Sequence, residues 1–314
     1  MLKIWHDIED TKRKHVHYCK QFVTVRHQQY QTGVLLPKLT SSEKTSIDSL
    51  MTLAFNNIDL ILGGRISELV EFDIRLEALN ADYSVLKDNI LKIFDYSFFS
   101  CTGLPYNKKK VWGSYQLVNG IGLKTCPYCN ESSTYAIYDQ NSGKMRAELD
   151  HFLPKSRYPF FALSFYNLIP VCHSCNHVKL EKSIEVNPHD DYFDDNDRFS
   201  FVPGISFFPL LSNDTSDSKV IFESDDLRKQ EQVRILLITE RYNHHKDIVV
   251  DIYRNKEVYN RIYNTSLNHL IPELGHLSEK DIFRMLFRVS PKLEEYHERP
   301  YSKLTNDLLR QLNS

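Results

Sequence analysis

Two pairs of closely spaced cysteines constrain this chain more than any other feature of its sequence. Two residues separate Cys126 from Cys129 and Cys172 from Cys175, and 42 residues lie between the pairs. A turn with this spacing can direct two thiolates at one ion, and four thiolates complete the tetrahedral shell that zinc adopts at structural sites. The sequence therefore predicts a structural zinc site that closes the intervening residues into a loop.

The remaining composition is that of a globular protein. The chain has 314 residues, of which 41% are hydrophobic and 25% are charged. The first residues, MLKIWHDIEDTKRKH, do not contain the apolar run of a secretory signal, and no stretch of about 18 apolar residues occurs. We therefore expect a cytoplasmic protein without a membrane span, in which thiols stay reduced. Cys19 and Cys101 are expected to be inert, partly buried thiols.

Charge is distributed unevenly although the net charge is only −2. Residues 104–182 contain ten Lys or Arg and five Asp or Glu, whereas residues 183–226 contain two Lys or Arg and eleven Asp or Glu. The basic excess around the cysteines can attract a phosphate backbone. An ordinary solvated basic face beside an acidic loop is the alternative interpretation.

Hydrophobic periodicity predicts an α+β fold that is mostly helical. In residues 40–64, helical spacing relates the apolar residues Ile47, Leu50, Met51, Ala54, Ile58, Ile61 and Leu62, and Gly63-Gly64 ends the pattern. A second run, Ile66, Leu69, Val70, Ile74, Leu76 and Leu79, and a third that begins near Ser84 are also expected to pack into a core. Helix is predicted again from about Asp225, and Ser278 with Asp281 forms a capping-box pattern.

The pattern changes between the cysteine pairs. Residues 134–139 and 145–152 have the composition of two strands around an Asn/Gly-containing turn. A short apolar strand follows Asn167, and a helix is predicted from about His173 to Lys182. The expected order is strand, strand, long loop, short strand and helix.

These patterns divide the chain into four segments. We expect a helical N-terminal region (1–103), a zinc-containing core (104–186), an acidic, loop-rich connector (187–224) and a helical C-terminal region (225–314). The sequence NPHDDYFDDNDRF (187–199) lacks the glycine and terminal glutamate of a calcium-binding loop, so we interpret it as an acidic surface segment. The C-terminal tyrosines form either a docking surface or part of a core; they are Tyr242, Tyr253, Tyr259 and Tyr263.

Chemically useful residues lie inside and just after the cysteine loop. Asp150 and His151 stand together at the end of a predicted strand, and Asn176 directly follows the last cysteine. On a helix, residues three and four apart share a face, so Asn176 and Lys179 are expected on the face that carries Cys172 and Cys175.

In order along the chain, the motifs read C-x2-C, D-H-x-x-P-x-S, N-L and C-x2-C-N-x-x-K, written here as CPYC, DHFLPKS, NL and CHSCNHVK. This pattern resembles the zinc-containing HNH endonucleases, a branch of the ββα-metal nucleases, over residues 126–182. The resemblance implies a ββα-metal core flanked by N- and C-terminal helical regions. Many such nucleases carry histidine after the last cysteine, whereas this chain has Asn176 and then His177.

The resemblance implies a role for each residue of the catalytic site. His151 would be the general base for water, and Asp150 and Asn176 would bind the catalytic Mg²⁺ or Mn²⁺, with His177 as an alternative to Asn176. Glu148 lies two residues before Asp150 on the same strand face, so it either joins the metal shell or is structural.

Further residues are implied around this centre. Asn167 would tie the long loop to the backbone and orient the base. Lys179, Lys155 and Arg157 would contact phosphate, although a solvated loop is the alternative for the last two. His173 and His177 are four residues apart, so they form either a second metal pair or a solvent-facing pair.

The leading interpretation is a metal-dependent HNH endonuclease that cuts double-stranded DNA. The alternatives are a nuclease that cuts RNA, such as tRNA, with the same site, and a zinc-containing nucleic-acid-binding or scaffold protein without catalysis. The arrangement, together with RPYSKLTNDLL (299–309), also resembles HNH proteins encoded beside an ATPase in bacterial anti-phage systems of the Septu and retron-associated kind. That resemblance implies an ATPase partner and a role in antiviral defence.

Overall fold

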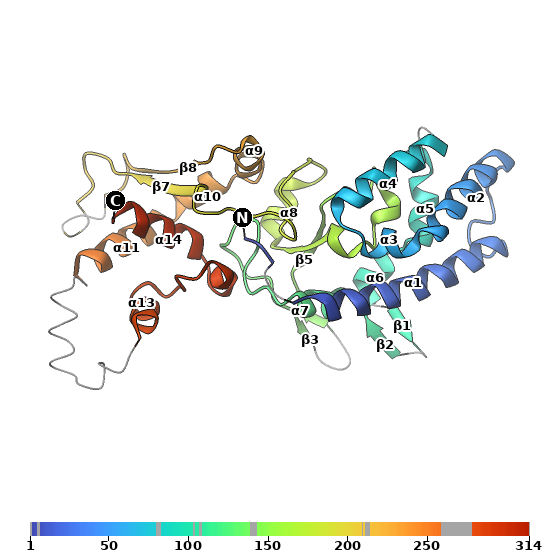
Figure 1. Cartoon of the computed structure of the whole chain (residues 1–314), viewed down its shortest axis with the longest axis horizontal. Helices are drawn as coiled ribbons and strands as arrows, with labels where there is room; N and C mark the ends of the chain where they lie inside the picture. The colour runs from blue at the N-terminus through green and yellow to red at the C-terminus, as the bar shows by residue number, and fades with distance from the viewer. Residues whose placement is uncertain are drawn as a thin grey trace.

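The structure, a computed structural model, describes residues 2–4, 7–79, 83–102, 104–106, 109–138, 143–208, 210, 214–258 and 278–313. Over these residues the protein has the predicted α+β character and is mostly helical (Figure 1). Two of the tyrosines considered above, Tyr259 and Tyr263, and most of the predicted turn after residue 138 lie outside the described residues. No helix in the described part of the chain is both long and apolar enough to cross a membrane.

Helices make up most of the N-terminal region. They are α1 (Glu9–Gln31), α2 (Ser41–Asn56), α3 (Ile58–Gly63), α4 (Ile66–Leu79), the 3-10 turn η1 (Tyr83–Leu86), α5 (Lys87–Ile93) and α6 (Tyr96–Thr102). A small antiparallel hairpin and a helix follow: β1 (Leu104–Tyr106), β2 (Lys109–Trp112) and α7 (Ser114–Ile121). Figure 1 shows α1 to α5 together at one end of the molecule.

The predicted helical stripe of residues 40–64 is confirmed, with one interruption. Thr40 and Glu43 form a capping box that starts α2, and Gly64 ends α3. The chain breaks between the two helices at Asn57, whose side chain bonds back to the carbonyl of Leu53 at 2.8 Å. All seven predicted apolar residues are buried. The stripe predicted for α4 is wrong in part, because Val70, Ile74 and Leu79 are exposed whereas Phe72 is buried.

The central region contains short strands and one helix. They are β3 (Ile137–Tyr138), β4 (Gly143–Met145), β5 (Glu148–His151), the 3-10 turns η2 (Pro159–Phe161) and η3 (Phe165–Asn167), β6 (Leu168–Val171) and α8 (His173–Lys179). The second predicted strand is divided in two, because β4 pairs with β3 whereas β5 pairs antiparallel with β6. The helix α8 ends at Lys179 rather than Lys182, since Leu180 adopts a positive φ of 48°.

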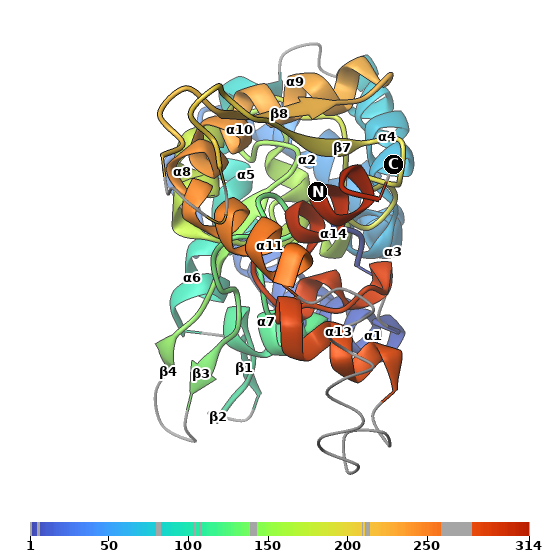
Figure 2. The same ribbon diagram turned by 90° about the vertical axis from the view of Figure 1, so that its left-hand side faces the viewer.

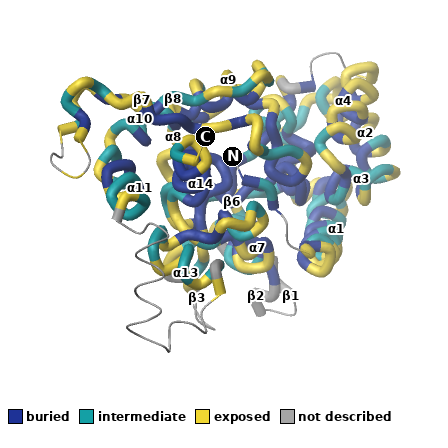
Figure 3. The backbone as a smooth tube through the Cα atoms, turned by 60° about the vertical axis from the view of Figure 1, so that its left-hand side comes forward, coloured by how far each residue is buried: buried dark blue, intermediate teal, exposed yellow. Residues whose placement is uncertain are grey.

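The C-terminal half contains a hairpin and further helices. They are β7 (Arg198–Val202), β8 (Lys219–Glu223), α9 (Leu227–Ile235), α10 (Ile238–His244), α11 (Lys246–Val258), α13 (Glu279–Phe287), η5 (Leu293–Glu298) and α14 (Ser302–Gln311). The capping box of Ser278 and Asp281 is present at the start of α13. Figure 2 shows α14 beside the β7–β8 hairpin, and Figure 3 shows that α14 is buried along most of its length.

The segment expected to be an acidic surface connector is more ordered than the sequence suggests. It supplies β7 and β8, which pair antiparallel over five residues each. Asn187, His189 and Asp197 of NPHDDYFDDNDRF are buried, so this stretch is not simply a surface segment. Its acidic side chains are used internally, since Asp197 accepts from Lys229 at 2.6 Å. Tyr242 is also buried, as expected for a core residue.

Hydrophobic packing groups the described buried residues into two clusters. The first cluster combines helices α1 to α7 with the loop after β5, including Phe160, Phe161 and Phe165. The second combines the four cysteines with β6 to β8 and the C-terminal helices. The segment 104–186 contributes to both clusters, which places β5 and α8 between them (Figure 1).

Candidate functional site

The four cysteines of the two pairs form one buried cluster. The turn between Cys126 and Cys129 is closed by a bond from the amide of Asn130 to the carbonyl of Cys126, at 2.8 Å. Cys172 caps α8, and its sulfur accepts from the amide of Cys175 at 3.5 Å. All four Sγ atoms lie within 4.8 Å of one another, and those of Cys129 and Cys172 are 3.8 Å apart. Sulfurs about 2.3 Å from a tetrahedral zinc are roughly 3.8 Å apart, so the cluster could hold a zinc ion, as the spacing predicts.

Charged groups surround this cluster in a way that suits thiolates. The guanidinium of Arg241 donates to Cys175 Sγ at 3.1 Å and also pairs with Glu131. Burial alone lowers the pKa of Arg241, but the Cys129 and Cys175 thiolates raise it above its ordinary value. Four thiolates around a dication carry excess negative charge, and Arg241 offsets part of it. Sequence reasoning missed Arg241, which lies 66 residues from Cys175 and follows no recognisable motif.

On the other side of α8, one face of β5 is turned toward this helix. Successive side chains of a strand point to opposite faces, so Glu148 and Asp150 share one face and His151 lies on the other. Glu148 accepts a hydrogen bond from Asn176 of α8, and Asp150 accepts one from Lys179. The two acidic residues of β5 therefore pack against the polar residues of α8.

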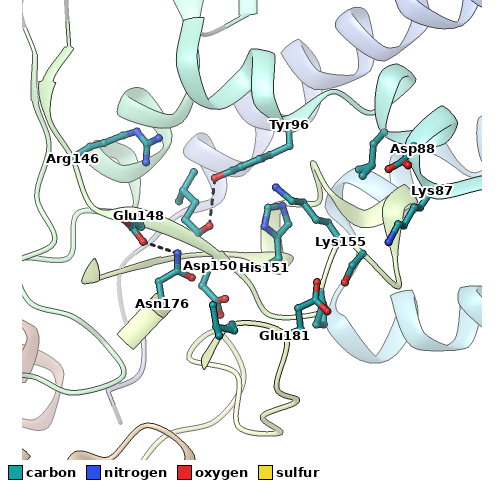
Figure 4. Close-up of a pocket in the computed structure, with 15 residues that line it drawn as sticks. Lys87, Asp88, Tyr96, Arg146, Glu148, Asp150, His151, Lys155, Asn176 and Glu181 are labelled. Atoms are coloured by element: carbon teal, nitrogen blue, oxygen red, sulfur yellow. Dashed lines mark hydrogen bonds between the residues drawn. The ribbon is translucent and has the colours of Figure 1, made fainter. Parts of the chain in front are cut away.

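A pocket of about 650 Å³ opens beside β5 and brings several of the predicted residues together (Figure 4). The predicted residues that line it are Glu148, Asp150, His151, Lys155 and Asn176. Helices α5 and α6 supply another wall, including Lys87, Asp88 and Tyr96. The other predicted residues, Asn167, His177, Lys179 and Arg157, are described but do not line this pocket.

His151 is held as a neutral imidazole. Its Nε2 lies 3.1 Å from the carbonyl oxygen of Ala162, which can only accept, so Nε2 carries the proton. Burial lowers the pKa of His151 to about 3, and the nearby Lys155 charge acts in the same direction. The edge of the Tyr96 ring contacts the imidazole, with ring centroids 4.4 Å apart. Among the described residues Nδ1 has no hydrogen-bond partner, so it is the free basic atom of the ring.

Asp150 is almost fully buried, and both carboxylate oxygens have a partner. Oδ2 accepts from the hydroxyl of Tyr128 at 2.7 Å, and Oδ1 accepts from Lys179 Nζ at 3.0 Å. Burial raises the pKa of Asp150, whereas the charge of Lys179 opposes the increase. Lys179 also donates to the carbonyl of His151 at 2.9 Å, and its side chain has no exposed surface. The expected phosphate contact of Lys179 is therefore wrong for this structure, because the ammonium is buried beneath the strand.

Asn167 ties the loop after β5 to the backbone, as the sequence predicts. Its Oδ1 accepts from the amide of Leu153 at 2.6 Å. Its Nδ2 donates to the carbonyls of Leu153 (3.1 Å) and Phe161 (2.9 Å). The last contact lies one residue before Ala162, whose carbonyl holds His151. Asn167 therefore supports the position of the imidazole without facing the pocket.

The structure distinguishes between Asn176 and His177. Asn176 lines the pocket, and its Nδ2 donates to Glu148 Oε2 at 2.6 Å. His177 is exposed and stacks on His173, with centroids 5.8 Å apart. His173 is also exposed and bonds to Glu148 Oε1 at 2.8 Å. The two histidines thus face solvent, and the pocket position belongs to Asn176.

The two loop cations differ in position. Lys155 lines the pocket, where its Nζ lies 4.7 Å from the centroid of the Tyr96 ring. Burial lowers the pKa of Lys155. Arg157 is exposed and stacks on Tyr158, 5.1 Å from the ring centroid. Of the two, Lys155 is placed to meet a ligand in the pocket.

Sequence reasoning missed the two tyrosines of the site. Tyr128 lies between the two cysteines of the first pair, and this position was the available signal. Tyr96 comes from a distant helix, and no sequence signal marked it as part of the site.

Comparison of the chain with protein-family models, curated proteins and solved structures finds no match. The interpretation of the site therefore depends on its geometry.

Proposed function

We propose that the protein is a metal-dependent HNH endonuclease that hydrolyses phosphodiester bonds in DNA. The observation that carries the proposal is the neutral His151, fixed by a backbone carbonyl in a pocket that also contains carboxylate and amide oxygens. Phosphodiester hydrolysis requires a base for water and a cation that neutralises charge on the phosphate. This pocket contains groups suited to both requirements.

In this proposal His151 accepts the proton of the attacking water at Nδ1. The bond from Nε2 to Ala162 holds the ring and its tautomer, which leaves the Nδ1 lone pair available. With a pKa of about 3 the imidazole is neutral near pH 7, but it is a weak base. A bound phosphate brings negative charge, which raises the pKa of His151 toward neutrality when the base is needed.

The oxygen donors fit a hard divalent cation. Asp150 and Asn176 would hold Mg²⁺ or Mn²⁺, since these ions prefer carboxylate and amide oxygens. Each Asp150 oxygen accepts one hydrogen bond, and an ionised carboxylate offers roughly four acceptor positions, so positions remain for an ion. Such an ion supplies Lewis acidity and charge neutralisation. A zinc ion with four thiolate ligands has no open position, so its role would be structural.

Lys155, Lys87 and Arg146 line the pocket and supply positive charge for a phosphate backbone. These cations suit the phosphate backbone of DNA and also that of RNA. The test therefore includes an RNA substrate beside DNA. The sequence resemblance further implies that the protein acts with an ATPase partner in anti-phage defence, and we include both in the proposal.

The test is a cleavage assay with plasmid DNA and tRNA, with Mg²⁺, Mn²⁺ or EDTA and with or without the neighbouring ATPase. We expect the wild type to cut DNA only with a divalent cation, and His151→Ala to lose at least about 100-fold in rate, the range of a general base. His177→Ala is the control, because this exposed histidine lies outside the pocket. If the protein cuts tRNA but not plasmid DNA, the proposed substrate becomes RNA instead of DNA. Binding without cleavage under every condition would contradict the nuclease proposal.

A further inference from the structure

Glu148 makes the shortest polar contact of α8 with β5. Its Oε2 accepts from Asn176 Nδ2 at 2.6 Å, and its Oε1 accepts from His173 Nδ1 at 2.8 Å. The carboxylate is partly exposed and lines the pocket, whereas Asp150 on the same strand face is buried.

This contact determines which way the amide of Asn176 faces. Both Glu148 oxygens accept a hydrogen bond here, and an amide has one donating and one accepting end. Glu148 therefore selects the rotamer in which Nδ2 points at the carboxylate and Oδ1 points away from it. Figure 4 shows this orientation, with the amide nitrogen toward Glu148 and the oxygen on the side of Asp150.

We propose that Glu148 is a positioning residue that presents the Oδ1 atom of Asn176 to a divalent cation in the pocket. The inference rests on the metal site of the proposed function. Without Glu148 the amide can rotate and offer its NH₂ group, which cannot bind a cation. Both Glu148 oxygens already have a hydrogen-bond donor, which fits a residue that acts through Asn176 rather than as a ligand. Partners of this kind affect metal affinity by about 10- to 100-fold when they are removed.

The test measures Mn²⁺ binding to the full chain by titration calorimetry, independently of cleavage. We expect Glu148→Ala to weaken Mn²⁺ binding by about 10-fold. Glu148→Gln keeps an oxygen that can accept from Asn176, so its affinity should stay within about 3-fold of wild type, because a neutral acceptor is weaker than a charged one. His177→Ala, on the same helix but outside the pocket, is the matched control.

A double-mutant cycle separates positioning from direct coordination. In an Asn176→Ala background, Glu148→Ala should cause no further loss, because a residue that acts through Asn176 has nothing left to orient. Two outcomes would overturn the inference and identify Glu148 as a ligand. One is that the losses of Mn²⁺ affinity caused by Glu148→Ala and Asn176→Ala add up. The other is that Glu148→Ala and Glu148→Gln lose the same affinity. Thermal unfolding of each variant without added Mn²⁺ or chelator checks that the fold persists.

The outcomes also separate this inference from the nuclease proposal. Weaker Mn²⁺ binding in Glu148→Ala, rescued in Glu148→Gln, supports positioning even where the wild type cuts no nucleic acid. If Glu148→Ala binds Mn²⁺ as tightly as the wild type, the positioning role of Glu148 is overturned. Metal-dependent cleavage by the wild type would then still support the nuclease proposal. Absence of Mn²⁺ binding by the wild type overturns the inference outright.

Discussion

Two buried lysine–aspartate pairs in this protein use similar groups for different purposes. Lys303 and Asp307 stand one turn apart in α14, within the C-terminal cluster, with 2% and 0% of their side chains exposed. Lys179 and Asp150 join α8 to β5, with 0% and 3% exposed. Nearly equal burial thus accompanies very different surroundings.

The C-terminal pair is enclosed on all sides by protein groups. Lys303 bonds both Asp307 oxygens and the backbone carbonyls of Asp194 and Asp197, and Asp307 also accepts from the amide of Phe199 at 2.9 Å. Burial lowers the pKa of Lys303 and raises that of Asp307. This complete enclosure indicates that the pair fixes α14 against the residues that lead into β7.

The pair at the site is open on one side, because Asp150 lines the pocket. Its oxygens have one partner each, so a cation that enters the pocket can share or replace Lys179. Two histidines, the buried His15 and the partly buried His151, differ in the same way. His15 donates to the carbonyl of Leu163 and accepts from Trp112, so both its nitrogens are used. Within the described part of the chain, the His151 ring bonds only to Ala162. The groups beside the pocket therefore keep hydrogen-bonding positions that a ligand could use.

Breaking the enclosed pair should have the largest effect. Lys303→Met removes the buried cation that contacts both Asp307 oxygens and leaves the half-exposed Arg310, whose Nη1 lies 3.6 Å from Oδ1. Loss of a buried partner of this kind costs about 3–5 kcal/mol in the free energy of unfolding. Urea denaturation without added Mn²⁺ measures the loss. Adding Mn²⁺ should not reduce the difference in the free energy of unfolding between variant and wild type, because the side chains of this pair are buried. A loss below about 1 kcal/mol would contradict the structural role.

Lys179→Met is the matched change at the open pair. Without added Mn²⁺ it should also cost about 3–5 kcal/mol in the free energy of unfolding, because Asp150 loses its buried cation. Adding Mn²⁺ should reduce the difference in the free energy of unfolding between variant and wild type by at least about 1 kcal/mol, since the ion takes over the charge that Lys179 supplied. The same difference with and without Mn²⁺ would show that Asp150 is as inaccessible to the ion as Asp307.

Features that depend on short sequence spacing could be predicted from the sequence. The cysteine cluster follows from two x2 spacings, and the starts of α2 and α13 follow from capping residues three apart. The placement of His151, Asp150 and Asn176 at one pocket also follows from a motif contained within about 30 residues of chain.

Features that depend on distant contacts could not be predicted. The β7–β8 hairpin appears in the sequence only as an acidic stretch, because its apolar positions become core only against α14. The burial of Lys179 requires Asp150, 29 residues away, and burial of a lysine is rare unless it is paired. The exposed Ile74 of α4 followed helical spacing, yet nothing in the described chain packs over it.

A smaller change tests the second partner of Asp150. Tyr128→Phe keeps the buried ring but removes the hydroxyl that donates to Oδ2 at 2.7 Å. Hydrogen bonds to charged groups contribute about 1.5–3 kcal/mol, so the free energy of unfolding without added Mn²⁺ should fall by about that amount. The enclosed pair offers no equivalent, because the corresponding donor to Asp307 is the backbone amide of Phe199. Wild-type stability in Tyr128→Phe would mean that Lys179 alone satisfies Asp150.

The smallest expected effect concerns the open histidine and appears as a pH dependence. Burial lowers the pKa of His151 to about 3 in the folded protein, against 6.5 for an ordinary histidine. Between these values the unfolded chain binds the additional proton, so the free energy of unfolding decreases as the pH falls below 6.5. His151→Ala should reduce this slope by about 1 kcal/mol per pH unit between about pH 5 and 6. Urea denaturation of the wild type and the variant across this range measures the two slopes. Identical slopes would show that His151 takes up its proton in the folded protein, so that the pocket is more accessible to water than its burial indicates.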